Sequence, residues 1–290
     1  MKNILVTGAN GQLAQCLKDV AEYANQDEYQ FVFVSRNELD ISNVKEIEDY
    51  FQSTNIDSVV NCAAYTAVDL AETETEKAFQ TNAEAVGNLA KICSENKIEF
   101  IHISTDYVFD GNSNEAFKVE DQTNPINVYG KSKLEGELLA MMNNPNSIII
   151  RTAWVYSQYG KNFMKTMLRL FSEKDEISVV NDQVGTPTNA NDIARAILKI
   201  IQSEKKIPGI YHFTNAGETT WYEFAETIKE FTQSETKINP IPTSQFPTPA
   251  IRPAFSVLDT QKIREVYQVQ TPDWKESLKN LLIQENFLEA

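Results

Sequence analysis

Apolar residues follow two alternating patterns along this chain. Short continuous runs, such as residues 2–7 and 147–153, are typical of strands buried on both faces, whereas longer segments carry an apolar residue every three to four positions and predict helices. The predicted strands cover residues 2–7, 31–36, 57–64, 100–105, 147–153 and 177–182. The predicted helices cover the segment after Gly11 to about residue 23, residues 40–54, 74–95, 161–172 and 191–201, and a segment beginning near Tyr129. This alternation predicts an α/β fold, a doubly wound parallel sheet of the Rossmann type.

The pattern changes after residue 182. Residues 183–188 form a loop signal, and the prolines between residues 240 and 253 argue against a helix or a central strand there. Short elements are expected around residues 210–215, 220–232, 259–267 and 273–287. We therefore predict a dinucleotide-binding domain over residues 1–182 and a smaller C-terminal lobe over residues 183–290 that supplies substrate contacts. Whether segments of this lobe return to the first domain stays open.

The composition argues against several classes of protein. With 26 basic and 41 acidic residues the formal charge is −15, which disfavours a general nucleic-acid-binding or acidic-membrane surface. The three cysteines, Cys16, Cys62 and Cys93, lack the spacing of a zinc site and are expected to be reduced. The first apolar run ends at Gly8 and is too short for a signal peptide or a membrane span. A cytoplasmic location is therefore expected.

A glycine turn follows the first strand directly. Glycines at such a turn let the backbone approach a pyrophosphate, and the start of the next helix supplies N–H donors and the positive end of its dipole. The spacing is G-x-x-G-x-x-A, with Ala14 in the third small position. Gly8 and Gly11 are the glycines of this turn and are expected to lie at the cofactor. The alternative is an ordinary turn, which two glycines after a strand often make.

The end of the second strand bears on which dinucleotide is bound. An acidic residue there is typical of sites selective for NAD, whereas an arginine can accept a 2′-phosphate. Ser35 and Arg36 come first in this chain, and Glu38 follows. This order favours NADPH, while use of NADH as well stays open.

Tyr129 and Lys133 carry the candidate chemistry. They lie four residues apart in a helical segment, so both side chains project from one face. A cation about 4 Å from a phenol offers roughly 4 kcal/mol, enough to bring the pKa of the phenol toward neutral pH. Tyr129 could then serve as a proton donor or acceptor. The alternative is a chance pair on an exposed helix face.

Thr105 ends the strand that precedes this helix and would share its cleft. A carbonyl placed there could be polarised by Thr105 and Tyr129 while a hydride arrives from a nicotinamide. Asp106, Tyr107 and Trp154 could shape the pocket, with Trp154 as a flat apolar wall against a sugar ring. The alternatives are a hydroxyl that only caps a turn for Thr105 and a core anchor for Trp154.

Together these motifs resemble the extended short-chain dehydrogenase/reductases and, within them, the dTDP-4-dehydrorhamnose reductase family. The resemblance runs through nearly the whole chain in family order. The matching blocks are residues 7–13, 60–69, 82–86, 104–111, 128–137, 151–156, 181–188 and 247–253. Such a series is far more specific than any one of its motifs.

The resemblance implies NADPH-dependent reduction of the C4 ketone of dTDP-4-dehydro-β-L-rhamnose, the last step of dTDP-rhamnose biosynthesis. It assigns Tyr129 as the proton donor, with Lys133 and Thr105 as its helpers, and places Asp106 and Trp154 at the sugar. The cofactor contacts that it implies are Asn10, Gly11, Gln12 and Leu13 at the phosphates, Asp40 and Ile41 near the adenine, and Ala63, Ala64, Tyr65 and Thr66 along the dinucleotide. Some relatives hold an interface magnesium ion with acidic side chains. The positions matched to them here are Cys16 and Asn191, so no metal is assigned.

Arg252 is the candidate contact for the diphosphate of the nucleotide sugar. The surrounding prolines stiffen its loop and lower the ordering cost of presenting a guanidinium to phosphate oxygens. The alternative is that Arg252 pairs only with a carboxylate. Other functions also stay open: an extended reductase or epimerase for a different nucleotide sugar, or a non-catalytic NADPH-binding regulator. The sequence leaves the base of the nucleotide, and the choice between a monomer and a homodimer, undecided.

Overall fold

The computed structural model of the protein describes residues 1–25 and 27–288. Its first half contains β1 (Lys2–Thr7), α1 (Gln12–Ala21), β2 (Tyr29–Val34), α2 (Val44–Ser53), β3 (Ser58–Asn61), α3 (Val68–Ala71), α4 (Thr75–Phe79), η1 (Gln80–Glu84), α5 (Ala85–Glu95), β4 (Glu99–Thr105), η2 (Asp106–Val108), α6 (Val128–Asn143), β5 (Ile148–Thr152) and β6 (Val155–Tyr156). Its second half contains α7 (Phe163–Glu173), β7 (Glu176–Val180), β8 (Val184–Gly185), β9 (Thr188–Asn189), α8 (Ala190–Gln202), β10 (Gly209–His212), β11 (Thr219–Thr220), α9 (Trp221–Phe231), β12 (Lys237–Ile241), η3 (Thr243–Gln245), α10 (Gln261–Tyr267) and α11 (Trp274–Gln284). Among these described helices, none is both long and apolar enough to cross a bilayer.

A six-stranded parallel sheet forms the centre of the molecule, with strand order β10-β5-β4-β3-β1-β2. The predicted Rossmann-type α/β fold is therefore confirmed. The chain runs outward from β1 to β2 and then returns to place β3 on the other side of β1. Loops that leave the carboxyl ends of β1 and β3 consequently diverge, and this is where ligands bind in open α/β sheets.

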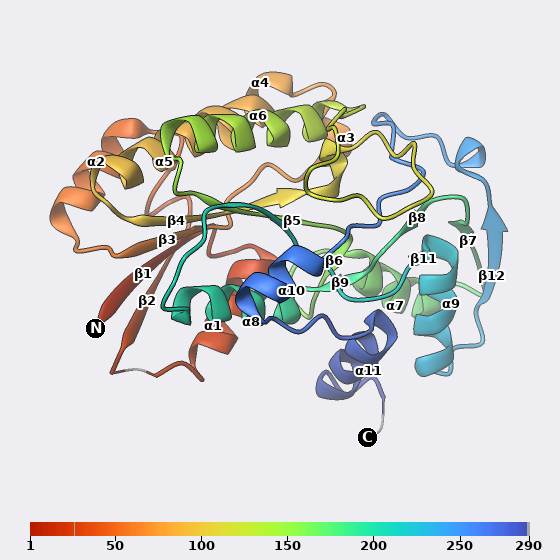
Figure 1. Ribbon diagram of the computed structural model, residues 1–290. Helices are drawn as coiled ribbons and strands as arrows, with labels where there is room; N and C mark the ends of the chain where they lie inside the picture. Colours follow the sequence, from red (N-terminus) through yellow and green to blue (C-terminus); the bar gives the residue numbers. More distant parts are fainter. Residues whose placement is uncertain (26, 289–290) are drawn as a thin grey trace.

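Helices cover both faces of this sheet (Figure 1). On β1, Ile4 and Val6 join a hydrophobic cluster with α1 and α8, whereas Leu5 joins a second cluster with α2 and α5. Successive strand residues point to opposite faces, so a strand covered on both sides must be apolar at every position. This explains the continuous apolar runs that predicted the strands.

The second lobe has its own hydrophobic core, built by α7, α9, α11 and the pair β7–β12. The division of the cores does not coincide with the predicted boundary at residue 182. Helix α8 and strand β10 follow that boundary but pack with the main sheet, whereas α7 and β7 precede it and pack with the second lobe. The expectation that residues 177–182 extend the main sheet is wrong. Strand β7 buries only its last two residues and pairs with β12, and β10 occupies the place beside β5. The last two residues of the predicted lobe, 289 and 290, lie outside the described part.

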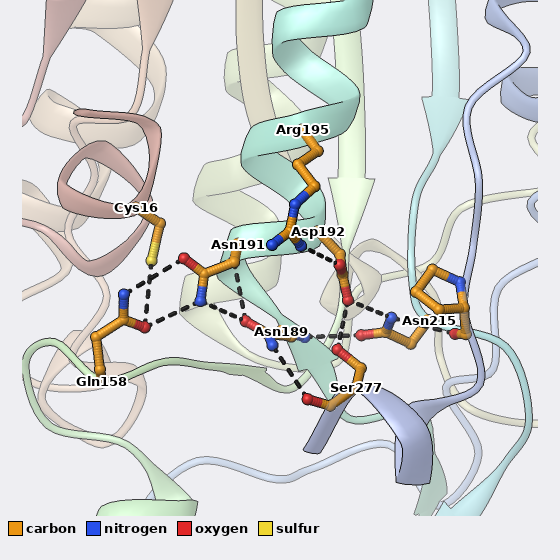
Figure 2. Close-up of polar contacts among 9 residues, drawn as sticks. Cys16, Gln158, Asn189, Asn191, Asp192, Arg195, Asn215 and Ser277 are labelled. Carbon is orange, nitrogen blue, oxygen red and sulfur yellow. Dashed lines mark hydrogen bonds and ion pairs between the residues drawn. The ribbon is translucent and has the colours of Figure 1, made fainter. Parts of the chain in front are cut away.

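The first turn of α8 ties the two lobes together. The Asp192 carboxylate accepts hydrogen bonds from Arg195 Nη1 at 2.6 Å and from Asn215 Nδ2 at 2.8 Å, and Ser277 Oγ of α11 donates to it as well (Figure 2). Asp192 is buried, so these three donors replace the water that its charge has lost. The second lobe is therefore fixed to a helix of the main domain.

Helix α6 approaches its neighbours closely at two glycines. A Cβ at Gly130 would lie far inside van der Waals contact with the carbonyl oxygen of Tyr107, and one at Gly136 would do the same with the carbonyl oxygen of Asn82. The helix begins at Asn127, whose side chain accepts a hydrogen bond from Gly130 N at 2.7 Å. These contacts set the position of α6, and with it that of Tyr129 and Lys133.

Gly136→Ala tests this close packing. In an open helix the change would stabilise the protein by about 1 kcal/mol, because alanine has the higher helix propensity. Here the clash with backbone should outweigh that gain, and we expect a net loss of about 1–3 kcal/mol in the free energy of unfolding by urea. Glu135→Ala, at an exposed position next to it, is the control and should change stability by less than about 0.5 kcal/mol. Equal stability of the Gly136→Ala variant and the parent would contradict the close approach.

Candidate active site

One cavity of about 820 Å³ lies over the carboxyl ends of the central strands. Residues of both the glycine turn and the Tyr129 helix line it, so the fold brings the two predicted halves of the site together. The predicted site residues in its lining are Gly8, Asn10, Gly11, Gln12, Leu13, Arg36, Asp40, Ile41, Ala63, Ala64, Tyr65, Thr66, Thr105, Asp106, Tyr107, Tyr129, Lys133 and Trp154. Arg252 lies outside this lining.

The turn after β1 has the shape expected for a dinucleotide. Gly8 has φ +73°, and a Cβ there would lie 2.7 Å from the backbone nitrogen of Ala63. Both facts require glycine, and they let the turn pack directly against the chain that leaves β3. Gly11 is the N-cap of α1, so the free N–H groups of the first helical turn face this end of the cavity. The turn therefore fits a pyrophosphate.

A fully buried asparagine shapes the loop after β3. Asn82 Oδ1 accepts a hydrogen bond from Tyr65 N at 2.8 Å, and its Nδ2 donates to Tyr65 O and to Ser132 Oγ, each at 3.0 Å. Asn82 lies in η1, a π-helical turn that interrupts the helix predicted over residues 74–95. Helix periodicity does not reveal such an insertion. The sequence signal for this interruption was Asn82 itself, a polar residue at a position where the helix pattern calls for an apolar one.

Arg36 lies in the turn that follows β2, just beyond the observed end of the strand, and pairs with Asp40. Arg36 Nε lies 3.0 Å from Asp40 Oδ2, and the arginine side chain is 74% exposed. Burial acts to raise the pKa of Asp40, but hydrogen bonds from Ser42 and Arg36 outweigh it and the pKa is lowered. Asp40 is thus a carboxylate that holds the guanidinium at the cavity. Ser35 and Ser42 also line this end, and our sequence analysis did not assign Ser42.

The structure does not support the expected effect of Lys133 on the Tyr129 phenol. Burial is the largest influence on Tyr129 and raises its pKa to about 12, although a hydrogen bond with Thr105 acts in the opposite direction. Lys133 instead bonds to the sheet below it, with Nζ 2.7 Å from Ile103 O and 3.3 Å from His102 Nε2. Tyr129 is therefore protonated at neutral pH, as a proton donor must be.

Thr105 and Asp106 form a second polar group beside the phenol. Thr105 Oγ1 donates to Asp106 Oδ1 at 2.9 Å, and Tyr107 N donates to Thr105 Oγ1 at 3.3 Å. Burial raises the pKa of Asp106 to about 6. Its second oxygen, Oδ2, is buried and has no well-formed hydrogen bond among the described residues, although the Ser256 side chain lies close enough to act toward a lower pKa of this carboxyl group. An orphaned acceptor of this kind costs about 1–3 kcal/mol, so its position at the cavity is consistent with a role in binding a hydroxyl group.

Both faces of the Trp154 indole are covered, contrary to the expected flat wall. Trp221 of α9 stacks on it with ring centroids 3.5 Å apart and an interplanar angle of 7°. A Cβ built at Gly185 would lie 2.7 Å from Trp154 Cζ2 and 2.7 Å from Trp154 Nε1. It would lie closer still to Cε2, the ring atom bonded to both. This point lies over the ring, so Gly185 covers the opposite face. Trp154 also has φ +47°, and only its rim and backbone are left to line the cavity.

Arg252 pairs with a carboxylate, which was the alternative to diphosphate binding. Its Nη1 and Nη2 lie 3.1 and 2.8 Å from the two oxygens of Asp69, and Nη1 also donates to Thr248 Oγ1 and, at 3.1 Å, to Ala250 O. Arg252 lies close enough to Tyr107, a residue of the cavity lining, for its positive charge to act toward a lower pKa of that phenol, against the larger raising effect of burial. The guanidinium is therefore held next to the cavity, with its plane fixed by Asp69.

Comparison with known proteins places this geometry in a family. Residues 1–287 match the family model described as RmlD substrate binding domain. The chain belongs to this family. The dTDP-4-dehydrorhamnose reductase of Sinorhizobium fredii is 40% identical over 288 residues, which are 96% of this chain and 96% of the relative.

Solved structures of the family share the whole fold. A dTDP-4-dehydrorhamnose reductase of Clostridium acetobutylicum is 41% identical with a TM-score of 0.93, covering 98% of this chain and 99% of its own. The dTDP-4-dehydrorhamnose reductase of Bacillus anthracis, solved in complex with NADP, is 37% identical with a TM-score of 0.93, covering 98% and 100%. The chain therefore shares the fold of these reductases over nearly their whole length.

The positions matched to the magnesium ligands of some family members do not fit a metal. Asn191 Nδ2 donates to Gln158 Oε1 at 2.9 Å and to Asn189 Oδ1 at 3.0 Å, and Cys16 Sγ lies 3.9 Å from Gln158 Oε1 (Figure 2). Burial raises the pKa of Cys16 to about 12, so the thiol keeps its proton. Magnesium takes oxygen ligands and usually carboxylates. Within the described residues no group of three or more His, Cys, Asp or Glu is arranged to hold a metal ion.

Replacement of Lys133 should change how stability depends on pH. Burial lowers its pKa to about 8, against the opposing effect of Glu137, whereas an unfolded lysine titrates near ~10.4. The unfolded chain therefore binds more protons between these values, and stability rises with pH across the window. Between about pH 7 and pH 9.5 the parent should gain roughly 2 kcal/mol in unfolding free energy relative to Lys133→Met.

The matched control is Lys131→Met, an exposed position on the same helix. Its difference from the parent should be the same at both pH values. A difference between parent and Lys133→Met that is also independent of pH would show that Lys133 does not titrate in this window.

Proposed function

We propose that the protein reduces the C4 ketone of dTDP-4-dehydro-β-L-rhamnose to dTDP-β-L-rhamnose with NADPH as the reductant. The observation that carries the proposal is that Thr105, Tyr129 and Lys133 line the same cavity as the glycine turn of Gly8 and Gly11. A 40% identity to a dTDP-4-dehydrorhamnose reductase over 96% of both chains supports this substrate. The NADP complex of the Bacillus anthracis enzyme supports the cofactor.

The loops that leave the carboxyl ends of β1 and β3 diverge, and residues on both sides of that point would hold the cofactor. The N–H groups at the start of α1 would bind the pyrophosphate, and the tight packing of Gly8 on Ala63 fixes the turn that presents them. Arg36, oriented by Asp40, would contact the 2′-phosphate. NADPH, when bound, supplies the hydride that the substrate C4 receives.

The chain's own residues would handle the proton. Tyr129 is protonated in its buried position, so its hydroxyl can hydrogen-bond the C4 carbonyl and then transfer its proton to the developing alkoxide oxygen. Thr105 would hydrogen-bond the same oxygen or the phenol. Lys133, one helical turn after Tyr129, would stabilise the phenolate that remains until water reprotonates it.

Asp106 and Arg252 are the proposed substrate contacts on the side of the sugar nucleotide. Asp106, whose Oδ2 has no well-formed hydrogen bond among the described residues, would accept a hydrogen bond from a sugar hydroxyl. Arg252, held by Asp69 near Tyr107, would contact a diphosphate at the mouth of the cavity. Tyr107 and the rim of Trp154 complete this wall.

A substrate panel tests the proposal directly. The purified protein is incubated with NADPH and dTDP- or UDP-linked 4-ketosugars, while the loss of NADPH absorbance is followed and the C4 configuration of the product is determined. We expect the highest kcat/KM for dTDP-4-dehydro-β-L-rhamnose, with one NADPH consumed per product. Conversion of sugar without net loss of NADPH would identify an epimerase. Cofactor binding without turnover on any sugar would identify a non-catalytic relative.

Tyr129→Phe should keep the affinity for NADPH and lose about 10²–10⁴-fold in kcat, because general acid catalysis typically contributes that factor. Single-turnover kinetics with saturating substrate measure the chemical step. Tyr107→Phe removes a neighbouring hydroxyl whose ring lies edge-to-face with Tyr129 at 5.6 Å, and it should lower kcat by less than about tenfold. A Tyr129→Phe variant that retains more than about a tenth of the parent rate would exclude this residue as the donor.

Arg36→Ala should weaken NADPH binding by about 1.5–3 kcal/mol, the range for a hydrogen bond to a charged group. NADH lacks the 2′-phosphate and serves as the control ligand, with an affinity that should change little. Calorimetric titration of both cofactors measures the two values. Equal losses for NADPH and NADH would mean that Arg36 does not contact the 2′-phosphate.

A further inference from the structure

A chain of buried polar side chains runs beneath the cavity from β1 to α6. Thr7 Oγ1 donates to Asn61 Oδ1 at 2.7 Å, Asn61 Nδ2 lies 3.0 Å from His102 Nδ1, and His102 Nε2 lies 3.3 Å from Lys133 Nζ. Thr7 pairs with Asn61 and Asn61 with His102 across the adjacent strands β1, β3 and β4. Each of the four residues is at most 1% exposed. Apart from Lys133, none of them has a role in the proposed reaction.

The partners of Asn61 decide which way its amide faces. Ala63 N–H, a backbone group that can only donate, points to Asn61 Oδ1 at 3.3 Å, and the Thr7 hydroxyl donates to the same oxygen. The amide nitrogen of Asn61 therefore faces His102. Because an amide nitrogen can only donate, His102 Nδ1 must accept.

The position of the proton on His102 follows from this. The pKa of His102 is far below its usual value, chiefly because the ring is buried, so the ring is neutral. A neutral imidazole carries one proton, and with Nδ1 as an acceptor that proton is on Nε2. The Nε2–H group then points at Lys133 Nζ, which must offer a lone pair. An ammonium group has none.

Burial is the largest influence on the pKa of Lys133, and three other ionisable groups lie near it. Cys62, at the end of β3, keeps its proton because burial raises its pKa to about 12. Glu137, one turn further along α6, is paired with Arg151 of β5, with Nη2 and Oε2 2.7 Å apart, and its charge still acts to raise the pKa of Lys133. Tyr129, one turn earlier, is a neutral phenol. Lys133 Nζ also donates to Ile103 O, a bond that both the amine and the ammonium can make.

We propose that His102 is a positioning residue that couples the charge of Lys133 to its own tautomer. With the proton on Nε2, as Thr7 and Asn61 hold it, Lys133 is a neutral amine. The ammonium form requires the proton on Nδ1, so that Nε2 accepts from Nζ, and it requires the Asn61 amide to turn over. The ring keeps one proton throughout, and Lys133 takes its own proton from water in the cavity.

The inference deepens the proposed function, because it rests on Lys133 as the residue that stabilises the Tyr129 phenolate. A lysine held in its neutral form would lose that ability. The observed orientation of the Asn61 amide favours the neutral form, so it opposes the ammonium form that catalysis needs. Burial lowers the pKa of Lys133 to about 8, so the two states exchange near physiological pH. Burial and this network together then set the pH above which catalysis falls.

Nitrogen-15 NMR of the ring nitrogens tests the tautomer without any substrate. The chain has two histidines, His102 and His212, so histidine-labelled protein gives two ring patterns, and His212→Gln assigns them. At about pH 9.5 we expect the His102 proton on Nε2, and at about pH 6.5 on Nδ1. In Lys133→Met the proton should stay on Nε2 at both pH values. The same tautomer at both pH values in the parent, or a switch that persists in Lys133→Met, would overturn the proposal.

Asn61→Asp tests the consequence for catalysis. A carboxylate accepts from His102 Nδ1–H and locks the tautomer that suits the ammonium, so the alkaline limb of kcat/KM should move up by about one pH unit or more. Asn143→Asp, which places the same charge farther along α6, where Asn143 bonds Gly87 O, should leave the limb unmoved. NMR of Asn61→Asp could show the His102 proton fixed on Nδ1 while the alkaline limb of its kcat/KM profile stays where it is in the parent. That result would refute the coupling.

The two experiments separate the inference from the proposed function. A protein without reductase activity that still shows the tautomer exchange would refute the function and leave the network intact. An active reductase with a fixed His102 tautomer would refute the network alone.

Discussion

The site depends on how closely α6 can approach the backbone around it. Gly130 and Gly136 meet carbonyl groups of η2 and of the π turn, and no larger residue fits at either place. Tyr129 and Lys133 are on this helix, so its distance from the sheet decides whether the phenol and the lysine side chain reach the cavity. A backbone contact of this kind positions side chains more rigidly than side-chain packing does, because backbone cannot change rotamer.

Close packing of α6 also buries charge, and the structure compensates for it with partners. Arg151 on β5 forms a two-pronged ion pair with Glu137, with Nε and Nη2 within 2.9 Å of its oxygens, and Ser104 Oγ donates to the same carboxylate. Both side chains are at most 3% exposed. Such a pair adds little net stability, since desolvation offsets the attraction. The geometry of this pair, however, fixes how α6 is rotated about its own axis. Glu137 lies one turn beyond Lys133 and faces the same side of the helix, so the pair also fixes the direction of Lys133.

Sequence patterns predicted the elements well because most of them bury one face or both faces against a single core. The predicted strands and helices of the first domain agree with the observed ones to within a few residues. The failures occurred where a non-local partner decided the outcome. Strand β7 looked like another strand of the sheet, but its pairing with β12 depends on a segment that lies about 60 residues away in the sequence. The helix over residues 74–95 contained a π turn, because Asn82 bonds the Tyr65 loop.

The sequence by itself determined the Rossmann-type fold, the place of the glycine turn and the presence of a tyrosine, a lysine and a threonine with the right spacing. These are local properties, since periodicity and short motifs depend on neighbouring residues. Only the tertiary structure decided the chemical state of the groups. The pKa of Tyr129 rises and that of Lys133 falls because burial, rather than their spacing of four residues, is the larger effect. The covered faces of Trp154 and the link from Lys133 to Thr7 likewise join distant segments, and contacts of this kind exist only once the chain has folded.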